Sequence, residues 1–122
     1  MAAPNIVNVS TITAKTVAAH LSTSTTTALL TNSASSGKVF KINTIIVSNV
    51  DGTNSADVTV LFTDASASDS FNICRTIAVP ADSTLVLTDK NSVLYLEEGD
   101  VIKGGASAAS DLDILISYEE IS

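Results

Sequence analysis

The chain has 122 residues, of which 45% are hydrophobic and only 16% are charged, and its mean hydropathy is +0.37. This composition predicts one folded domain and excludes an intrinsically disordered chain. The net charge of −7, six basic residues and the lack of tryptophan argue against binding nucleic acid through phosphates or stacked bases.

The charges are divided unevenly along the chain. Residues 1–50 contain three lysines and no acidic residue, whereas residues 51–122 contain all thirteen acidic residues. Two interpretations remain open. The division is chance in an acidic protein, or the N-terminal part lies against an acidic surface, such as the acidic end of a neighbouring copy.

Residues 1–10 are expected to form an extended arm. Pro4 interrupts regular structure, yet Ile6, Val7 and Val9 give the segment apolar side chains that could dock on the domain or on a partner. The segment lacks the basic start and apolar core of a signal peptide, and no stretch of the chain approaches 18 apolar residues. We therefore expect synthesis in a cytoplasm and no transmembrane helix.

The next part of the chain predicts two strands. In residues 11–21 the β-branched residues outweigh the alanines and favour a strand over a helix. Residues 22–27 are a serine and threonine turn that leads into a short strand at 28–31, and residues 32–37 are a loop of small polar residues.

Residues 39–62 are the centre of the pattern. The β-branched run 39–50 and the alternating run 56–62 predict two strands, and the turn formers at 51–55 predict that they form a hairpin. In the first of these strands Ile42 and Ile46 are expected on one face and Ile45 and Val47 on the other. A strand that is apolar on both faces indicates a central strand covered on both sides, by a second sheet, a partner subunit or loops.

The second half of the chain reads as strands separated by turns. Residues 64–70 have the composition of an exposed tip, and residues 104–110 that of a flexible loop. Strands are expected at residues 71–79, 83–88, 92–96, 101–103 and 111–121.

The complete pattern predicts an all-β fold. Eight or nine strands with regular turn signals and no convincing helix are typical of an antiparallel β-sandwich, either jelly-roll-like or immunoglobulin-like. We expect residues 1–10 as the arm and residues 11–122 as a single domain.

No residue pattern predicts a catalytic, cofactor-binding or metal-binding site. His20 and Cys74 are the only residues of their kinds, so we interpret them as a surface or structural histidine and a small packed thiol. Residues 51–57 loosely resemble a calcium loop, but the glycine is misplaced and the final glutamate is missing, so a plain hairpin turn is the better interpretation. The pairs Glu97-Glu98 and Glu119-Glu120 are interpreted as a solvated acidic rim. We therefore expect no enzymatic activity and no cofactor.

Five segments together resemble a known family: MAAPNIVNVSTITAKT, KVFKINTIIVSNVDGTNSADVTV, TIAVPADSTLVL, LYLEEGDVIK and ASAASDLDILISYEEIS. They are similar to the small virion structural proteins of tailed bacteriophages, in particular those of phages that infect marine cyanobacteria. The resemblance covers most of the chain and departs most in residues 63–72. It implies a non-enzymatic structural protein of the virion and brings no catalytic residues.

The expected function is a capsid decoration or cement protein that bridges major subunits on the particle exterior. The expected partners are the major capsid protein or other virion proteins and further copies of the chain, for example in a trimer, but neither nucleic acid nor membrane. Docking is expected within residues 2–17, through Pro4, Ile6, Val7, Val9, Ile12 and Lys15.

Two alternatives stay open. The protein could be an accessory of the tail or neck, or a module that binds glycans on the host surface. Against the glycan alternative, Tyr95 and Tyr118 are the only tyrosines, and the strand pattern places both in or near the core.

Overall fold

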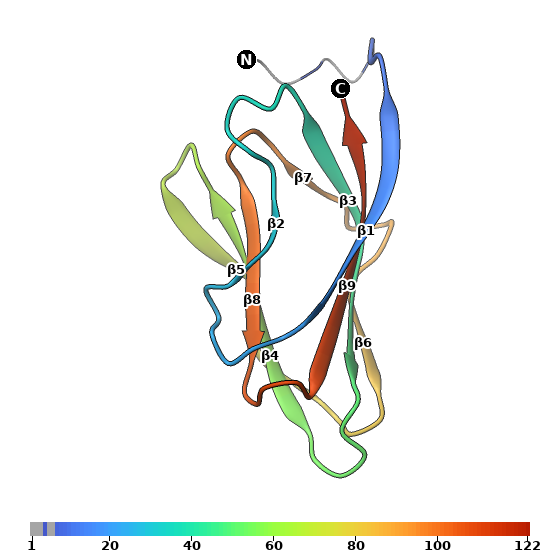
Figure 1. Cartoon of the computed structure of the whole chain (residues 1–122), viewed down its shortest axis with the longest axis vertical. Helices are drawn as coiled ribbons and strands as arrows, with labels where there is room; N and C mark the ends of the chain where they lie inside the picture. The colour runs from blue at the N-terminus through green and yellow to red at the C-terminus, as the bar shows by residue number, and fades with distance from the viewer. Residues whose placement is uncertain (1–3, 5–6) are drawn as a thin grey trace.

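The computed structural model describes Pro4 and residues 7–122, and these residues form nine β-strands and no helix (Figure 1). None of them belongs to a helix able to cross a membrane. The strands are β1 (Ile12–His20), β2 (Ala28–Thr31), β3 (Val39–Asn49), β4 (Ala56–Asp64), β5 (Asp69–Val79), β6 (Thr84–Thr88), β7 (Leu94–Leu96), β8 (Val101–Ala106) and β9 (Leu112–Ile121).

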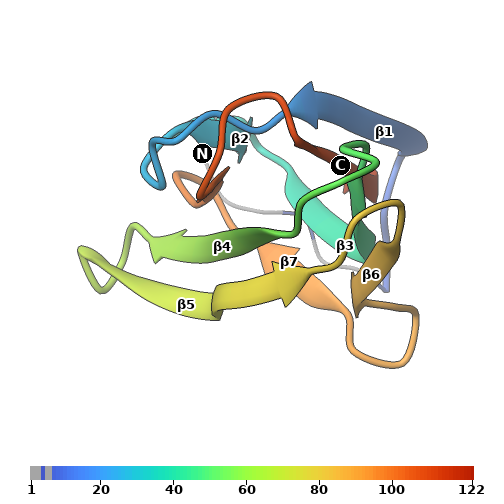
Figure 2. The same ribbon diagram turned by 90° about the horizontal axis from the view of Figure 1, so that it is seen from below.

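The strands form two antiparallel sheets. Sheet A has the order β1-β9-β3-β6, with β7 also paired to β3, and sheet B has the order β2-β8-β4-β5. Figure 1 shows sheet A on the right and sheet B on the left, and Figure 2 shows the same two layers from below. β1 pairs with β9, β2 with β8, β3 with β6 and β4 with β5. This nesting is the jelly-roll arrangement, so the predicted β-sandwich is confirmed in its jelly-roll form.

The hairpin predicted for residues 39–62 is wrong, because β3 and β4 lie in different sheets and the segment between them crosses from one to the other. The buried side chain of Asn49 holds this crossing. Its Nδ2 donates to the carbonyl oxygens of Asn54 (3.0 Å) and Val79 (2.8 Å), and its Oδ1 accepts from the amide of Asp51 at 2.8 Å. The turn residues reverse the chain as expected, but they do not select the partner strand.

β3 is a central strand of sheet A, but its two faces differ from the prediction. Its pairing with β9 shifts between Ile42 and Thr44, so that the intervening residue is a β-bulge. The bulge places Ile42 on the same face as Ile45 and Val47, and all three side chains are fully buried. Ile46 lies on the opposite, outer face and is only partly buried.

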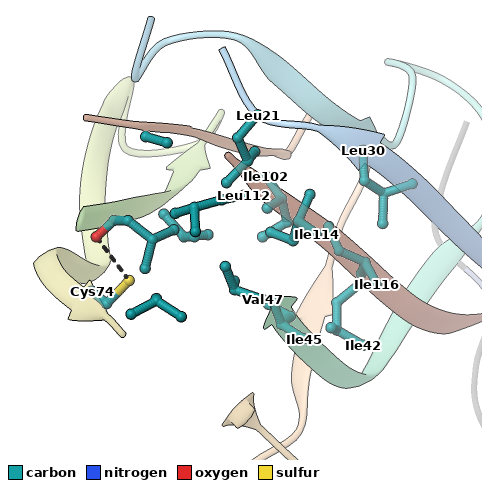
Figure 3. Packing of buried hydrophobic residues seen from close by; sticks show 14 of the residues in the cluster. Leu21, Leu30, Ile42, Ile45, Val47, Cys74, Ile102, Leu112, Ile114 and Ile116 are labelled. Carbon is teal, nitrogen blue, oxygen red and sulfur yellow. Dashed lines mark hydrogen bonds between the residues drawn. The ribbon is translucent and has the colours of Figure 1, made fainter. Parts of the chain in front are cut away.

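The core lies between the two sheets (Figure 3). In β9 the predicted alternation is confirmed, since Leu112, Ile114 and Ile116 are fully buried there. Cys74 is packed in the same cluster, with its Sγ 3.8 Å from the carbonyl oxygen of Val58, as the dashed line in Figure 3 marks. Cys74 is 6% exposed, which confirms the predicted packed thiol, and burial raises its pKa.

β8 continues to Ala106, so the flexible loop predicted for residues 104–110 is wrong at its start. The segment that follows β1 runs along this strand, since Gly104 N–H donates to Thr27 O at 3.1 Å and Ala106 N–H donates to Ser22 O at 2.8 Å. A Cβ on Gly104 would lie 2.8 Å from Thr59 O, and one on Gly105 would strike the carbonyl of Ser24. The glycines allow close backbone approach rather than flexibility.

Candidate functional site

The polar residues that the sequence analysis considered one by one, His20 and Asp51, take part in local contacts in the structure. The side chain of His20 is 81% exposed on β1, and its Nδ1 is hydrogen-bonded to Oδ1 of Asp113. Asp51 Oδ1 accepts from the amides of Thr53 at 2.8 Å and Asn54 at 3.3 Å, which closes a local turn. Within Pro4 and residues 7–122, no three His, Cys, Asp or Glu side chains are grouped to hold a metal ion.

One ionic cluster lies at the end of the sandwich where β9 finishes. Glu120 Oε1 is 2.7 Å from Lys15 Nζ, and its Oε2 is 3.2 Å from Lys38 Nζ. The Glu120 side chain is only 10% exposed, so the solvated acidic rim predicted for this residue is wrong. Two of the three lysines in residues 1–50 therefore find an acidic partner within their own chain.

The cluster shifts the pKa values of its members. The hydrogen bond from Lys15, followed by the interaction with Lys38, lowers the pKa of Glu120 against the opposing effect of burial. The same contact with Glu120 raises the pKa of Lys15. Burial, with a further contribution from the Glu120 charge, raises the pKa of Tyr118, whose ring packs 5.2 Å from that of Phe40. The arrangement ties β1, β9 and the start of β3 together.

Replacing Glu120 with glutamine should lower the free energy of unfolding at pH 7 by about 1–2 kcal/mol, because both lysines lose a charged acceptor. A lowered folded-state pKa stabilises the fold above the ordinary value of 4.5, and that stabilisation is lost as the pH falls through the folded-state pKa. The difference between the two proteins should therefore shrink below about pH 4.5. Urea unfolding at pH 7 and at lower pH measures both effects.

Glu97 provides the matched control. It is exposed and has no lysine or arginine within ion-pair distance among the described residues. Glu97→Gln should leave the free energy of unfolding unchanged within about 0.5 kcal/mol at either pH. An equal loss in both variants would contradict a specific role for the cluster.

The residues predicted to dock are distributed over the N-terminal segment and β1. Val7 is 90% exposed and Ile12 is 55% exposed. Pro4 and Val9 are half-buried, and Ile6 lies outside the described residues. Lys15, also predicted to dock, is the lysine paired with Glu120.

The start of β1 is attached to the last residues of the chain. The amides of Ser10 and Thr11 donate to the carbonyl oxygen of Ser122 at 2.7 and 3.0 Å, and Ser122 N–H donates to Thr11 O at 2.9 Å. These bonds hold the base of the predicted arm at one end of the sandwich.

The outer face of sheet A carries a second candidate surface. Strand pairing aligns one residue from each of four strands: Ala18 of β1 with Leu115 of β9, Leu115 with Ile46 of β3, and Ile46 with Val86 of β6. We call these four residues the apolar row. Leu115 is 39% exposed and Val86 is 57% exposed. Contiguous exposed apolar side chains are typical of interaction sites.

A depression lies at the β1 end of the apolar row, and polar side chains contribute to its lining. This shallow depression of about 180 Å³ lies beside Leu115, and its lining includes Ala18, His20 and Asp113. Tyr95 of β7 is also on this sheet and is 43% exposed, so its predicted place in the core is wrong, whereas Tyr118 is 7% exposed and its placement is confirmed. The sequence could not reveal the apolar row, because only the register of four separate strands brings its members together.

Comparison with models of protein families gave no match, and comparison with curated proteins and with solved structures gave no significant similarity.

Proposed function

We propose that this protein is a non-enzymatic structural protein of the virion, which acts as a capsid decoration or cement protein on the particle exterior. The resemblance of its segments to small virion proteins of tailed phages supports this function. The jelly roll adds support by analogy, since viral capsid and lectin domains share that architecture. The partners are the major capsid subunits that each copy would bridge.

The observation that carries the proposal is the exposed apolar side chains at the start of the chain. Val7 and Ile12 are 90% and 55% exposed. The Ser10 and Thr11 bonds to Ser122 hold the intervening backbone on the sandwich. Burying such side chains contributes about 25 cal/mol per Å² of apolar surface. Because a capsid offers many equivalent sites, a weak contact per copy is enough when copies act together.

Deleting residues 1–9, which removes Val7 and keeps Ile12, should weaken binding to particles of a phage strain from which the gene for this chain has been removed. The deletion spares Ser10 and Thr11, whose amides bond to Ser122, so the sandwich should stay folded. Co-sedimentation of the purified chain with these particles measures binding, and circular dichroism checks the fold. Unchanged binding by the truncated chain would reject docking through this segment.

The position of the bound protein separates the capsid role from the tail or neck alternative, and electron microscopy of labelled particles shows it directly. The exposure of Tyr95, at 43%, favours the glycan-binding alternative, as does the jelly-roll architecture that lectin domains share. Binding on a glycan array that is lost in Tyr95→Ala, without any binding to particles, would replace the proposed function with that alternative.

A further inference from the structure

We propose that the outer face of sheet A binds a second copy of this chain, related by a twofold axis that runs along the strands between β9 and β3. This self-association goes beyond the proposed function, because it concerns a second copy of the chain and not the particle. A twofold axis in this position lays the two faces against each other. It places β9 of each copy over β3 of the other, and β1 over β6 and β7.

A charged row crosses the same face two register steps from the apolar row. Strand pairing aligns Ala14 of β1 with Glu119 of β9, Glu119 with Lys41 of β3, and Lys41 with Tyr95 of β7. Within the described residues Lys41 has no carboxylate within 4.0 Å. The only side-chain hydrogen bond described for Glu119 comes from Asn43 Nδ2 at 3.3 Å. Both charges are therefore available to a partner.

The proposed axis makes the charged row complementary to itself. Glu119 and Lys41 are cross-strand partners on β9 and β3, and the axis passes between these two strands. The rotation consequently brings the partner's Lys41 over Glu119 and the partner's Glu119 over Lys41. Two ion pairs form for one symmetric contact, and opposite charges that face each other fix the register of an interface.

In the apolar row, small side chains of one copy face large side chains of the other copy. The rotation places the partner's Val86 over Ala18, beside the depression, and the partner's Ile46 over Leu115. In the charged row it places the partner's Tyr95 over Ala14. The two small residues of β1 thus face the two large exposed residues of β6 and β7, which are 57% and 43% exposed. Sheets that pack face to face bring their side chains together in this way, about 10 Å apart.

A third row of aligned residues lies next to the apolar row, on the side away from the charged row, and it is also complementary to itself. His20 and Asp113 stand on one side of the axis, and Ser48 and Thr84 stand on the other in the same register. The rotation places the partner's Ser48 over Asp113, where its hydroxyl can donate to the carboxylate. Because the contact is isologous, it closes at two copies and leaves no free equivalent face.

The size of the face sets the expected strength. Four strands at about 4.8 Å spacing and about eight residues at 3.3 Å give a face of roughly 500 Å² per copy. Interfaces of this size belong to the smaller class of specific contacts. We therefore expect a dimer that dissociates in the micromolar range and weakens as salt screens the two ion pairs.

Sedimentation velocity of the full chain without particles, from about 1 to about 500 µM, tests the proposal in the range expected for such interfaces. The expected result is a concentration-dependent shift from monomer to dimer. Lys41→Glu alone and Glu119→Lys alone should each be monomeric over this range, because like charges then face each other across the axis. A mixture of the two variants should form a heterodimer, since two acidic side chains of one copy then face two lysines of the other.

Phe71 gives the control for non-specific apolar contact. It is 51% exposed on β5 of sheet B, away from this face, so Phe71→Ala should dimerise like the unchanged chain, whereas Val86→Lys should not. A monomer at every concentration, a trimer, or a dimer insensitive to both charge variants and to Val86→Lys would overturn the proposal. None of these results bears on particle binding, which the deletion of residues 1–9 tests separately.

Discussion

Replacing Gly105 with alanine should destabilise the fold by about 3 kcal/mol or more, at the upper end of what overpacking costs. The new Cβ would meet the carbonyl of Ser24, whose carbon atom would lie 2.7 Å away, and Ser22 O at 3.0 Å. These are backbone atoms, so no side-chain rotation relieves the clash. Moving the segment away would break the hydrogen bonds that Thr27 O and Ser22 O accept from β8. Urea unfolding followed by circular dichroism measures the loss.

Gly52 is the matched control for this prediction. It lies in the crossing between β3 and β4, and a Cβ there would find its nearest neighbour, Asp82 Oδ2, at an ordinary 3.5 Å. Gly52→Ala should therefore change the free energy of unfolding by less than about 0.5 kcal/mol. If both alanine variants were equally stable, the close approach of residues 22–27 to β8 would be incorrect.

Truncating Ile45 to alanine should lower the free energy of unfolding by about 2–5 kcal/mol. Ile45 is fully buried between the sheets in the central strand β3, and its neighbours Ile42 and Val47 on the same face are fully buried too. Removing the side chain loses its transfer free energy and leaves a cavity that the closely packed core can close only in part. Chemical denaturation at low protein concentration measures the monomer alone.

Ile46 separates this prediction from a general effect of shortening an isoleucine in β3. It follows Ile45 directly but lies on the outer face, where it is only partly buried. Ile46→Ala should therefore cost at most about 1 kcal/mol, because little buried apolar area is removed. If Ile46→Ala proved as costly as Ile45→Ala, the placement of Ile46 on the outer face of sheet A would be incorrect.

Much of the fold could be predicted because strand patterns are local. The alternation in residues 111–121 identified the core face of β9, and turn residues marked most strand ends. The pairing of β3 with β4 failed because turn chemistry reverses the chain without selecting the sheet. The prediction of which β3 side chains share a face failed because of the bulge. One extra residue inverts the alternation of side chains beyond it, and nothing in the local sequence marks that residue.

The candidate surfaces were harder to predict than the strands. The N-terminal apolar residues could be proposed in advance, because they are neighbours in the sequence. The role of Glu120 was missed because its neighbour Glu119 points to the other face, and a pair of adjacent acids looks solvated in the sequence alone. The apolar and charged rows depend on residues from four strands and on exact register, which no local pattern contains.

The nesting of the strands also has a consequence for biosynthesis. β9 lies between β1 and β3 in sheet A, so β1 has no partner in its sheet until residues 112–121 have left the ribosome. Closing a loop of this length before any contact forms slows folding. Until then β3 is paired only with β6 and β7, and its other edge lacks a partner. Unpaired strand edges of this kind aggregate readily. We expect the yield of soluble protein to depend on how quickly the last strand is completed, and slower translation of the final segment to favour inclusion bodies.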